Sequence, residues 1–114
     1  MDLKDKIIII TGAANGIGRA MAIRFAAQGA KKIICADLDE NGVRETAKQI
    51  DGIAHKLDVS READISALIE ATETDVGPID LYCSNAGISI AGGVEVDDEG
   101  WQKIWAINLM AHVW

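Results

Sequence analysis

The sequence predicts an α/β fold built on a doubly wound parallel sheet, with strands in the spatial order 3-2-1-4. Two observations predict this class. Short aliphatic runs alternate with segments of helical periodicity along the 114 residues, and a glycine-rich turn separates the first aliphatic run from the first helical segment. Strands that alternate with helices form parallel sheets with right-handed crossovers, so we expect helices on both faces.

The first half of the chain is expected to hold three strands and two helices. Residues 6–10 form a continuous aliphatic run, which indicates a strand buried on both faces. Residues 17–28 carry apolar side chains at helical spacing, and Gly29 is a plausible C-terminal cap. The remaining elements are a strand over 32–36, a polar helix over 40–50 and a weaker strand over 53–57.

The second half is expected to add two helices and one strand. Ser60 can cap a helix whose apolar stripe contains Ile65, Leu68, Ile69 and Thr72. Gly77 and Pro78 break that helix, and residues 79–84 form the fourth strand. A glycine-containing loop over 87–93 then leads to a helix that begins near Asp98 and runs towards Trp114, with Trp101, Trp105 and Leu109 on one side. We expect Trp101 and Trp105 to pack in the core or against another subunit.

The number of strands is small for this class of fold. A doubly wound sheet of six strands, at about 30 residues per strand–helix unit, needs roughly 180 residues. We therefore expect residues 1–114 to form the first part of a single domain of this fold, without the rest of it.

Composition and charge exclude several classes of function. Eleven basic and eighteen acidic residues give a formal net charge of −7, which argues against nucleic acid as a partner. The longest unbroken aliphatic run is four residues, so we expect no membrane span. The first residues carry acids without a long apolar core behind them, so no ordinary secretion signal is expected.

The cysteines and histidines indicate neither disulfides nor a metal site. Cys35 and Cys83 lie far apart in apolar surroundings, which fits a reducing cytoplasm. His55 and His112 lack partners at metal-ligand spacing, so we expect no metal site.

The glycine turn, residues 11–18, lies where a phosphate-binding loop belongs in this architecture. Gly12 allows a sharp turn out of the strand, Gly16 lets the backbone approach a pyrophosphate, and Gly18 lets the helix pack closely on the sheet. The free N–H groups at the helix start then favour an anion despite the net charge. A glycine-rich turn without a ligand is the alternative. No Gly-Lys-Ser/Thr follows, which disfavours ATP hydrolysis of the Walker type.

An acidic residue follows the second expected strand. Asp37 comes 19 residues after Gly18, and dinucleotide-binding folds carry an acid about 20 residues on that binds the adenosine ribose hydroxyls. A carboxylate there repels a 2′-phosphate, and the neighbours Leu38, Asp39 and Glu40 do not offset it. We therefore expect NAD(H) rather than NADP(H). The alternative is a solvated turn aspartate or a helix N-cap.

Five motifs occur in order along the chain: Thr11-Gly12-x-x-x-Gly16-Ile17-Gly18, Asp37, Asp58-Val59, Ser84-Asn85-Ala86-Gly87 and Asn108. With these motifs, the whole chain resembles the short-chain dehydrogenases/reductases. The resemblance implies a Rossmann-like fold and an NAD cofactor. It also implies that residues 1–114 form the N-terminal part of a single NAD-binding Rossmann domain, without its C-terminal catalytic part. The cofactor-binding residues that we expect are Gly12, Asn15, Gly16, Ile17, Gly18, Asp37, Leu38, Asp58, Val59, Asn85, Ala86 and Gly87.

The resemblance also implies individual roles. Asp58 corresponds to an acid that binds the adenine amino group, with the backbone of Val59 beside it. Residues 85–87 correspond to a motif that lines the cofactor site, although the family often has Asn where this chain has Ser84. Asn108 corresponds to the helix asparagine of the catalytic tetrad, whose main-chain carbonyl holds a water of the proton relay. Asp58 as a helix-entry acid, residues 85–87 as an ordinary turn and Asn108 as a merely polar residue remain alternatives.

The catalytic pair of that family, a tyrosine followed four residues later by a lysine, does not occur in the chain. The only tyrosine is Tyr82, and Ala86 stands four residues after it. Tyr82 is expected to be a packed strand residue. The resemblance implies an NAD(H)-dependent oxidoreductase that interconverts an alcohol and a carbonyl, acts on a small molecule and forms a homo-oligomer. Residues 1–114 alone are expected to be inactive.

Two other functions stay open. One is a non-catalytic nucleotide-binding or regulatory module. The other is a methyltransferase, which also uses a glycine loop and an acid after the second strand. It is disfavoured because its cofactor has no pyrophosphate.

Overall fold

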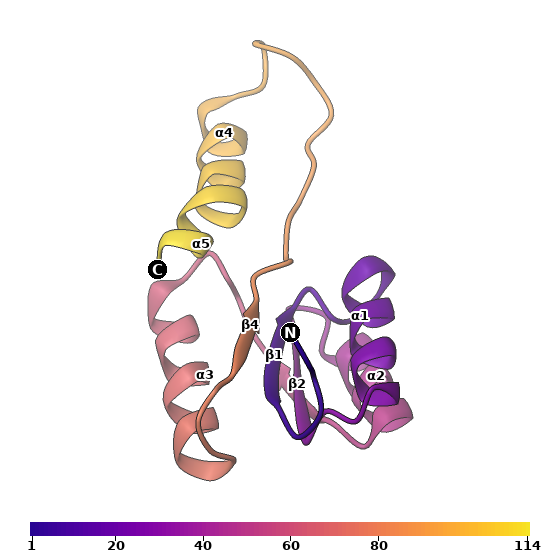
Figure 1. Cartoon of the computed structure of the whole chain (residues 1–114). Helices are drawn as coiled ribbons and strands as arrows, with labels where there is room; N and C mark the ends of the chain where they lie inside the picture. The colour runs from indigo at the N-terminus through magenta and orange to yellow at the C-terminus, as the bar shows by residue number, and fades with distance from the viewer.

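Four parallel strands in the order β3-β2-β1-β4 form the sheet that supports the rest of the chain. A computed structural model describes residues 1–114. The strands are β1 (Ile7–Thr11), β2 (Lys32–Asp37), β3 (Ile53–Lys56) and β4 (Leu81–Cys83). The helices are α1 (Gly16–Ala27), α2 (Glu40–Ile50), α3 (Glu62–Asp75), α4 (Asp98–Trp105), the π-helix η1 (Ala106–Met110) and α5 (Ala111–Val113). Figure 1 shows their arrangement. The predicted fold class and strand order are confirmed.

The central strand β1 explains why the sheet is covered on both sides. All five of its residues are buried, and its side chains alternate between two hydrophobic clusters. Ile8 and Ile10 belong to one cluster, and Ile7 and Ile9 belong to the other. Because successive side chains of a strand point to opposite faces, a run of four isoleucines demands a helix layer on each face.

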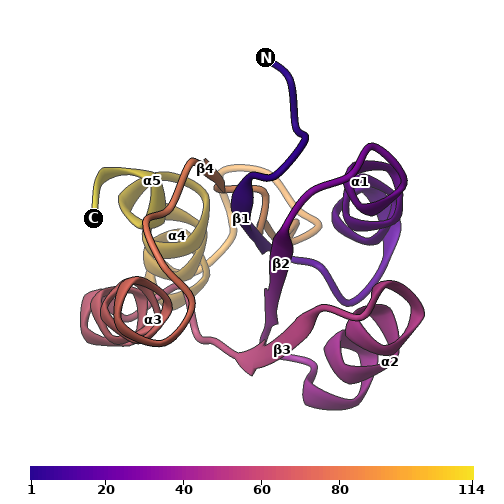
Figure 2. The same cartoon turned by 60° about the horizontal axis from the view of Figure 1, so that its bottom comes forward.

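The helices divide between the two faces accordingly (Figure 2). Ala22 of α1 and Val43 and Ala47 of α2 pack in the cluster that contains Ile8. Ile65 and Leu68 of α3 pack in the cluster that contains Ile9, and Ala111 of α5 joins them. Each cluster is formed by one set of helices, so the sheet is doubly wound, as the sequence predicted.

The helix ends agree with the sequence in part. Gly29 follows the last residue of the α1 cap with φ +86°, and its N–H donates to the Ala26 carbonyl oxygen, which confirms it as the C-terminal glycine. The predicted cap at Ser60 is wrong. Arg61 occupies the N-cap of α3 without a side-chain hydrogen bond, because the Ser60 hydroxyl donates instead to Asp58 Oδ1 at 2.6 Å.

The last predicted helix is not a regular α-helix. It is α-helical over Asp98–Trp105, becomes a π-helix over Ala106–Met110 and ends as the short α5. Helical spacing in the sequence does not distinguish one widened turn from an α-helix, so this feature was missed. No helix of the chain is both long and apolar enough to cross a bilayer.

Two tryptophans that were expected to be packed are exposed, and so is Ile17. Ile17 is 72% exposed because it stands at the first turn, beyond the end of the sheet. Trp101 and Trp105 are 51% and 61% exposed, so packing in the core is wrong for them. Packing against another subunit stays a prediction.

The two cysteines differ in their surroundings. Cys35 on β2 is fully buried, whereas Cys83 at the end of β4 is only half-buried. Burial raises the pKa of both thiols, and it raises the pKa of Cys35 to about 11 from its ordinary value of 9.0. Buried thiols that stay protonated act as small apolar residues.

The raised pKa of Cys35 predicts a loss of stability in alkali. The unfolded thiol ionises near pH 9, while the folded thiol stays protonated until about pH 11. Ionisation of the Cys35 thiol in the unfolded state lowers the free energy of unfolding. The free energy of unfolding is therefore unaffected by this thiol below pH 9 and is about 1 kcal/mol lower at pH 10. Urea melts at pH 8 and pH 10 would measure the fall, and Cys35→Ala should lessen it by that amount. An equal fall in both proteins would contradict the expectation.

Candidate functional site

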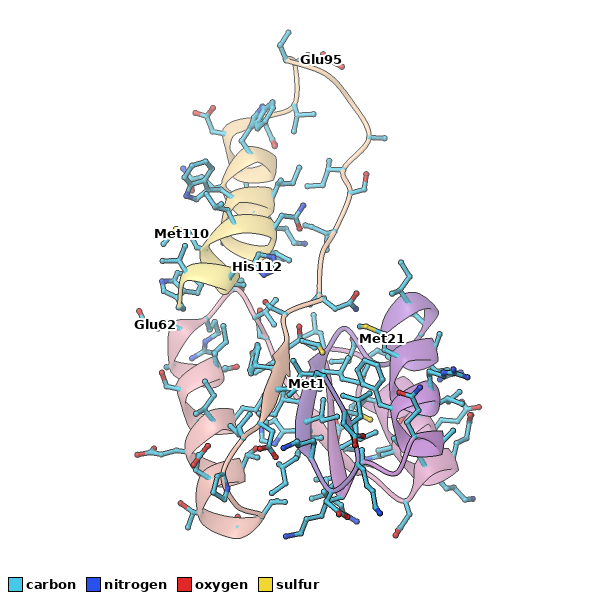
Figure 3. All side chains as sticks on the ribbon, in the orientation of Figure 1. Met1, Met21, Glu62, Glu95, Met110 and His112 are labelled. Atoms are coloured by element: carbon cyan, nitrogen blue, oxygen red, sulfur yellow. The ribbon has the colours of Figure 1, made fainter.

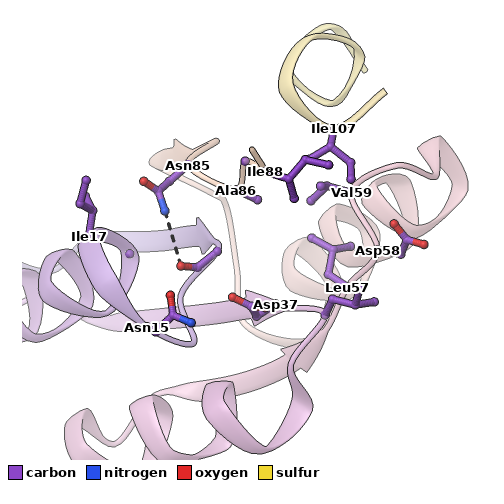
Figure 4. Close-up of a pocket in the computed structure, with 14 residues that line it drawn as sticks. Asn15, Ile17, Asp37, Leu57, Asp58, Val59, Asn85, Ala86, Ile88 and Ile107 are labelled. Carbon is purple, nitrogen blue, oxygen red and sulfur yellow. Dashed lines mark hydrogen bonds between the residues drawn. The ribbon is translucent and has the colours of Figure 1, made fainter. Parts of the chain in front are cut away.

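A cleft of about 380 Å³ opens at the carboxyl ends of the strands, where the chain order reverses between β1 and β4. Ligands of open α/β sheets bind at this kind of switch point. The close-up in Figure 4 shows Ile17 and Asn15 at one side of the cleft and Asp58 at the other. The lining residues are Gly12, Asn15, Ile17, Gly18, Asp37, Leu38, Leu57, Asp58, Val59, Asn85, Ala86, Gly87, Ile88 and Ile107.

The glycine turn is folded back on the start of α1 at van der Waals distance. A Cβ added to Gly18 would lie 2.1 Å from the Gly12 carbonyl oxygen and 2.9 Å from Asn85 Nδ2. No real side chain fits there. Gly12 itself has φ +67°, and a Cβ on it would lie 3.0 Å from the Ala86 Cα. The two glycines therefore let the turn, α1 and the exit of β4 meet at one point.

Gly16 is required for another reason. It has φ +53°, a conformation that glycine adopts without strain, and a Cβ on it would meet nothing within 4 Å. Asn15, the N-cap of α1, makes no side-chain capping hydrogen bond, and the first turn contains no acid. The first N–H groups of α1 are thus free of a competing side chain and can receive an anion at the positive end of the helix dipole.

Asp37 supports the turn as well as the cleft. Its Oδ2 accepts a hydrogen bond from the Ala14 N–H at 3.0 Å, and its Oδ1 accepts one from the Asp39 N–H at 2.9 Å. A carboxylate has about four acceptor sites, so each oxygen retains capacity for a hydroxyl donor. Leu38 beside it is 62% exposed at the cleft. No cation lines the cleft near this carboxylate.

Asp58 lies at the entry to α3 and also lines the cleft, so its position fits both roles that the sequence left open. Its Oδ1 accepts hydrogen bonds from the Ser60 N–H at 3.0 Å and the Ser60 hydroxyl at 2.6 Å, which makes it a helix-entry acid. Its Oδ2 accepts no hydrogen bond within the chain, and the residue lines the cleft together with Val59. One carboxylate oxygen is therefore available to a donor in the cleft.

The exits of β1 and β4 are joined by a hydrogen-bond cluster centred on Thr11. The Thr11 hydroxyl oxygen accepts from the Asn85 and Ala86 N–H groups, both at 3.0 Å, and it donates to the Cys83 carbonyl at 3.4 Å. Asn85 Nδ2 donates to the Thr11 carbonyl at 3.0 Å and to the Gly12 carbonyl at 3.5 Å; the second bond is dashed in Figure 4. These bonds fix the rim of the cleft.

Asn108 lies outside the lining of the cleft. Its Oδ1 accepts from the Ile88 N–H at 2.9 Å, and its Nδ2 donates to the Ile88 carbonyl at 2.8 Å. The residue is part of η1, and π-helical turns of this kind occur often at functional sites. Its side chain thus clamps the loop after β4, and the neighbouring Ile107 reaches the cleft.

The sequence predicted the lining well but not completely. All the expected cofactor-binding residues line the cleft except Gly16, which is exposed at the start of α1. Leu57, Ile88 and Ile107 line it without having been expected, because an apolar residue carries no motif. The role of Thr11 was also missed. Its signal is a hydroxyl residue between a buried strand and the first glycine of the turn.

The cleft is lined by groups that can form hydrogen bonds with a ligand. It lacks side chains that transfer protons near neutral pH. Its only ionisable lining residues are Asp37 and Asp58. Tyr82 packs against the cluster on the α3 face, and burial raises its pKa. Backbone hydrogen bonds, foremost from the Gly93 N–H, lower the pKa of Glu95, but Figure 3 shows Glu95 at the tip of the 88–97 loop, away from the sheet. No group of three or more metal-ligating side chains gathers anywhere in the chain.

Comparison with known proteins identifies the class. The family model described as short chain dehydrogenase matches residues 6–114, and the chain belongs to this family. A 3beta-hydroxysteroid dehydrogenase 1 of Eggerthella lenta is 36% identical over 114 residues, which is 95% of this chain and 44% of that protein. The chain thus spans less than half the length of this relative.

Solved structures agree with the fold. A short-chain dehydrogenase/reductase of Burkholderia phymatum in complex with NAD superimposes with a TM-score of 0.94 at 30% identity, over 99% of this chain and 42% of that one. A 3-ketoacyl-(acyl-carrier-protein) reductase of Brucella melitensis complexed with NADH gives a TM-score of 0.90 at 35% identity, over 97% and 47%. The Rossmann-like fold is therefore shown.

The contact between Gly18 and Gly12 predicts unequal effects of alanine in the turn. Gly18→Ala drives a methyl group into a carbonyl oxygen and should lower the free energy of unfolding by about 3 kcal/mol or more. Gly16→Ala meets open space and costs only its left-handed conformation, about 1 kcal/mol. Urea denaturation of both variants measures the difference. Equal losses would contradict the close approach.

Proposed function

We propose that this chain is the cofactor-binding part of an NAD(H)-dependent oxidoreductase that interconverts an alcohol and a carbonyl. The observation that carries the proposal is the convergence, in one cleft, of the glycine turn, the carboxylates of Asp37 and Asp58, and the Asn85–Gly87 strand exit. NAD and NADH in two structurally similar members of the family support it. Because substrate-contacting residues vary within one fold, the proposal extends only to a small alcohol or carbonyl compound.

The residues of the cleft fit a dinucleotide. The free N–H groups at the start of α1 would receive the pyrophosphate, and the open space at Gly16 leaves room for it. Asp37 would accept hydrogen bonds from the adenosine ribose hydroxyls. Asp58, through its unengaged oxygen, and Val59 would hold the adenine. Residues 85–87 would line the cofactor site on the β4 side.

The chemistry then divides between the cofactor and the protein. NAD supplies the hydride acceptor when it is bound. By resemblance to the family, Asn108 would contribute to a proton relay through its main-chain carbonyl, while its side chain is engaged with Ile88. The general acid–base pair, a tyrosine with a lysine four residues later, has no counterpart within residues 1–114. In this proposal it is supplied outside these residues.

Partners and location follow from the same features. We propose a homo-oligomer, because Trp101 and Trp105 present an exposed aromatic pair on α4, and large exposed apolar patches mark interfaces. A reducing cytoplasm is proposed because both cysteines are free. The net charge of −7 argues against nucleic acid as a partner.

A second candidate is a nucleotide-binding module without catalysis. It is favoured by one observation, which is that no Lys, His, Tyr or Cys lines the cleft. Binding of NAD together with an absence of hydride transfer in the full protein would support this alternative over the enzyme. A methyltransferase is less favoured, because S-adenosylmethionine has no pyrophosphate for the glycine turn to bind and gives the Asn85–Gly87 strand exit no role.

Asp37 is expected to select NAD over NADP. Its carboxylate repels a 2′-phosphate, and no cation lines the cleft to compensate. Calorimetry on the full protein should therefore give tighter binding of NAD, and Asp37→Ala should reduce the ratio of the two dissociation constants at least about tenfold. The ratio cancels any loosening of the turn that affects both cofactors. Asp75→Ala removes the same charge from an exposed site on α3 and should leave the ratio unchanged. Equal or tighter binding of NADP by the parent protein contradicts the assignment.

Residues 1–114 expressed alone should show no turnover. With no Tyr-x-x-x-Lys in the segment, the alkoxide formed or consumed in the reaction has no general acid–base partner. The measurement is the NADH absorbance with a panel of secondary alcohols and ketones. Turnover above the rate without protein would show that the missing tyrosine is dispensable.

A further inference from the structure

We propose that Thr46 and Arg19 are positioning residues that hold the glycine turn in the conformation that receives the pyrophosphate. The inference rests on the proposed function, because it concerns the same cleft. Neither residue lines that cleft. Both act on the main chain of the turn from behind, through a relay of hydrogen bonds that connects α1, α2 and residues 13–14.

Thr46 is an anomaly within its helix. α2 is polar along most of its length, yet Thr46 is 0% exposed. Its hydroxyl donates to the Ala13 carbonyl oxygen at 2.8 Å, and Ala13 is itself fully buried. The sequence separation of 33 residues makes this a tertiary contact between α2 and the turn, not a local feature of the helix.

Arg19 decides where the Thr46 hydroxyl proton points. A buried threonine in a helix can donate to the carbonyl four residues earlier, here Gly42, which lies 3.2 Å away. The hydroxyl has only one proton. Arg19 donates from one terminal nitrogen to the Gly42 carbonyl at 3.2 Å and from Nε to the Thr46 hydroxyl oxygen at 2.8 Å. With Gly42 satisfied by Arg19, the proton of Thr46 goes to Ala13.

The guanidinium of Arg19 is committed to α2. Besides Thr46 and Gly42, it lies 3.9 Å from the Glu45 carboxylate, so all three of its partners belong to that helix. Its side chain is only 28% exposed, and the residue does not line the cleft.

The turn is consequently held from two elements at residues 13 and 14. The Ala13 N–H donates to the Ala36 carbonyl at 3.2 Å, and the Ala14 N–H donates to Asp37 at 3.0 Å. Thr46 holds the remaining Ala13 carbonyl. Because the carboxyl end of β2 and the middle of α2 both hold the turn, the residues before Gly16 have little freedom. A turn that is already ordered loses less conformational entropy when the ligand binds, so the ligand binds more tightly.

The test compares a ligand that needs the turn with one that does not. ADP-ribose contains the pyrophosphate, whereas adenosine reaches only the ribose and adenine groups. In the full protein, Thr46→Val keeps the shape and removes the hydroxyl, and we expect about tenfold weaker binding of ADP-ribose with adenosine changed less than about twofold. Thr46→Ser restores the hydroxyl and should recover ADP-ribose binding.

The matched control is Thr72→Val. Thr72 is a buried threonine on α3, and its hydroxyl donates only to the Leu68 carbonyl of its own helix. The same chemical change there should leave both affinities unchanged. The inference is overturned if Thr46→Val binds ADP-ribose as the parent does, or if it loses adenosine and ADP-ribose equally. A parent protein that binds adenosine but gains nothing from the pyrophosphate overturns the proposed function itself.

Arg19 supplies a second, independent measurement should Thr46→Val not fold. Arg19→Gln alters a partly exposed side chain and should weaken ADP-ribose binding about threefold. If Arg19 acts through the Thr46 hydroxyl, Arg19→Gln should weaken ADP-ribose binding by less than about 1.5-fold in a Thr46→Ala background, which lacks that hydroxyl, as a double-mutant cycle would reveal. Fully additive effects would show that Arg19 touches the ligand directly and would overturn its positioning role.

Discussion

The site depends on the hydrogen bonds that join the exits of β1 and β4 around Thr11. The two strands are adjacent in the sheet but more than 70 residues apart in the sequence, and their register brings Ile10 beside Cys83. One hydroxyl accepts two main-chain N–H groups there, and Asn85 returns a hydrogen bond to the Thr11 carbonyl. Because buried polar groups are costly when unpaired, a loss at either partner would disturb both sides of the cleft. Every other part of the rim, from the glycine turn to the loop after β4, is positioned relative to this junction.

Glycine allows close backbone contacts at this junction, and polar side chains fix the position of the turn by hydrogen bonds. Gly18 allows contact that no side chain permits, whereas Asp37 ties the turn to the end of β2. Asp37 thereby has two roles that do not compete, since a carboxylate can accept from the chain and from a ligand at once. A residue of this kind couples the shape of the turn to the chemistry that selects the ligand.

The sequence predicted those parts of the fold that depend on local pattern. The continuous isoleucines of β1 demand burial on two faces, and α2 was predicted from its spacing with the bounds that the structure has. The glycine spacing and Asp37 were sufficient to locate most of the cleft. The features that were missed depend on tertiary contacts. Ser60 does not cap α3 because its hydroxyl donates to Asp58. Arg19 forms its hydrogen bonds with another helix. The widened turn at Asn108 has no periodic signature in the sequence.

The reciprocal hydrogen bonds between Asn108 and Ile88 have a consequence for how this protein can vary. They close a loop of 20 residues at its base, so the chain between them projects from the sheet while its two ends stay fixed beside the cleft. The entropy of loop closure grows slowly, by about 0.6 kcal/mol for each doubling of length. Insertions, deletions and substitutions at residues 89–97 of this segment, none of which lines the cleft, therefore cost the cofactor cleft little. A clamp of two hydrogen bonds separates a part of the molecule that must keep its geometry from a part that is free to change.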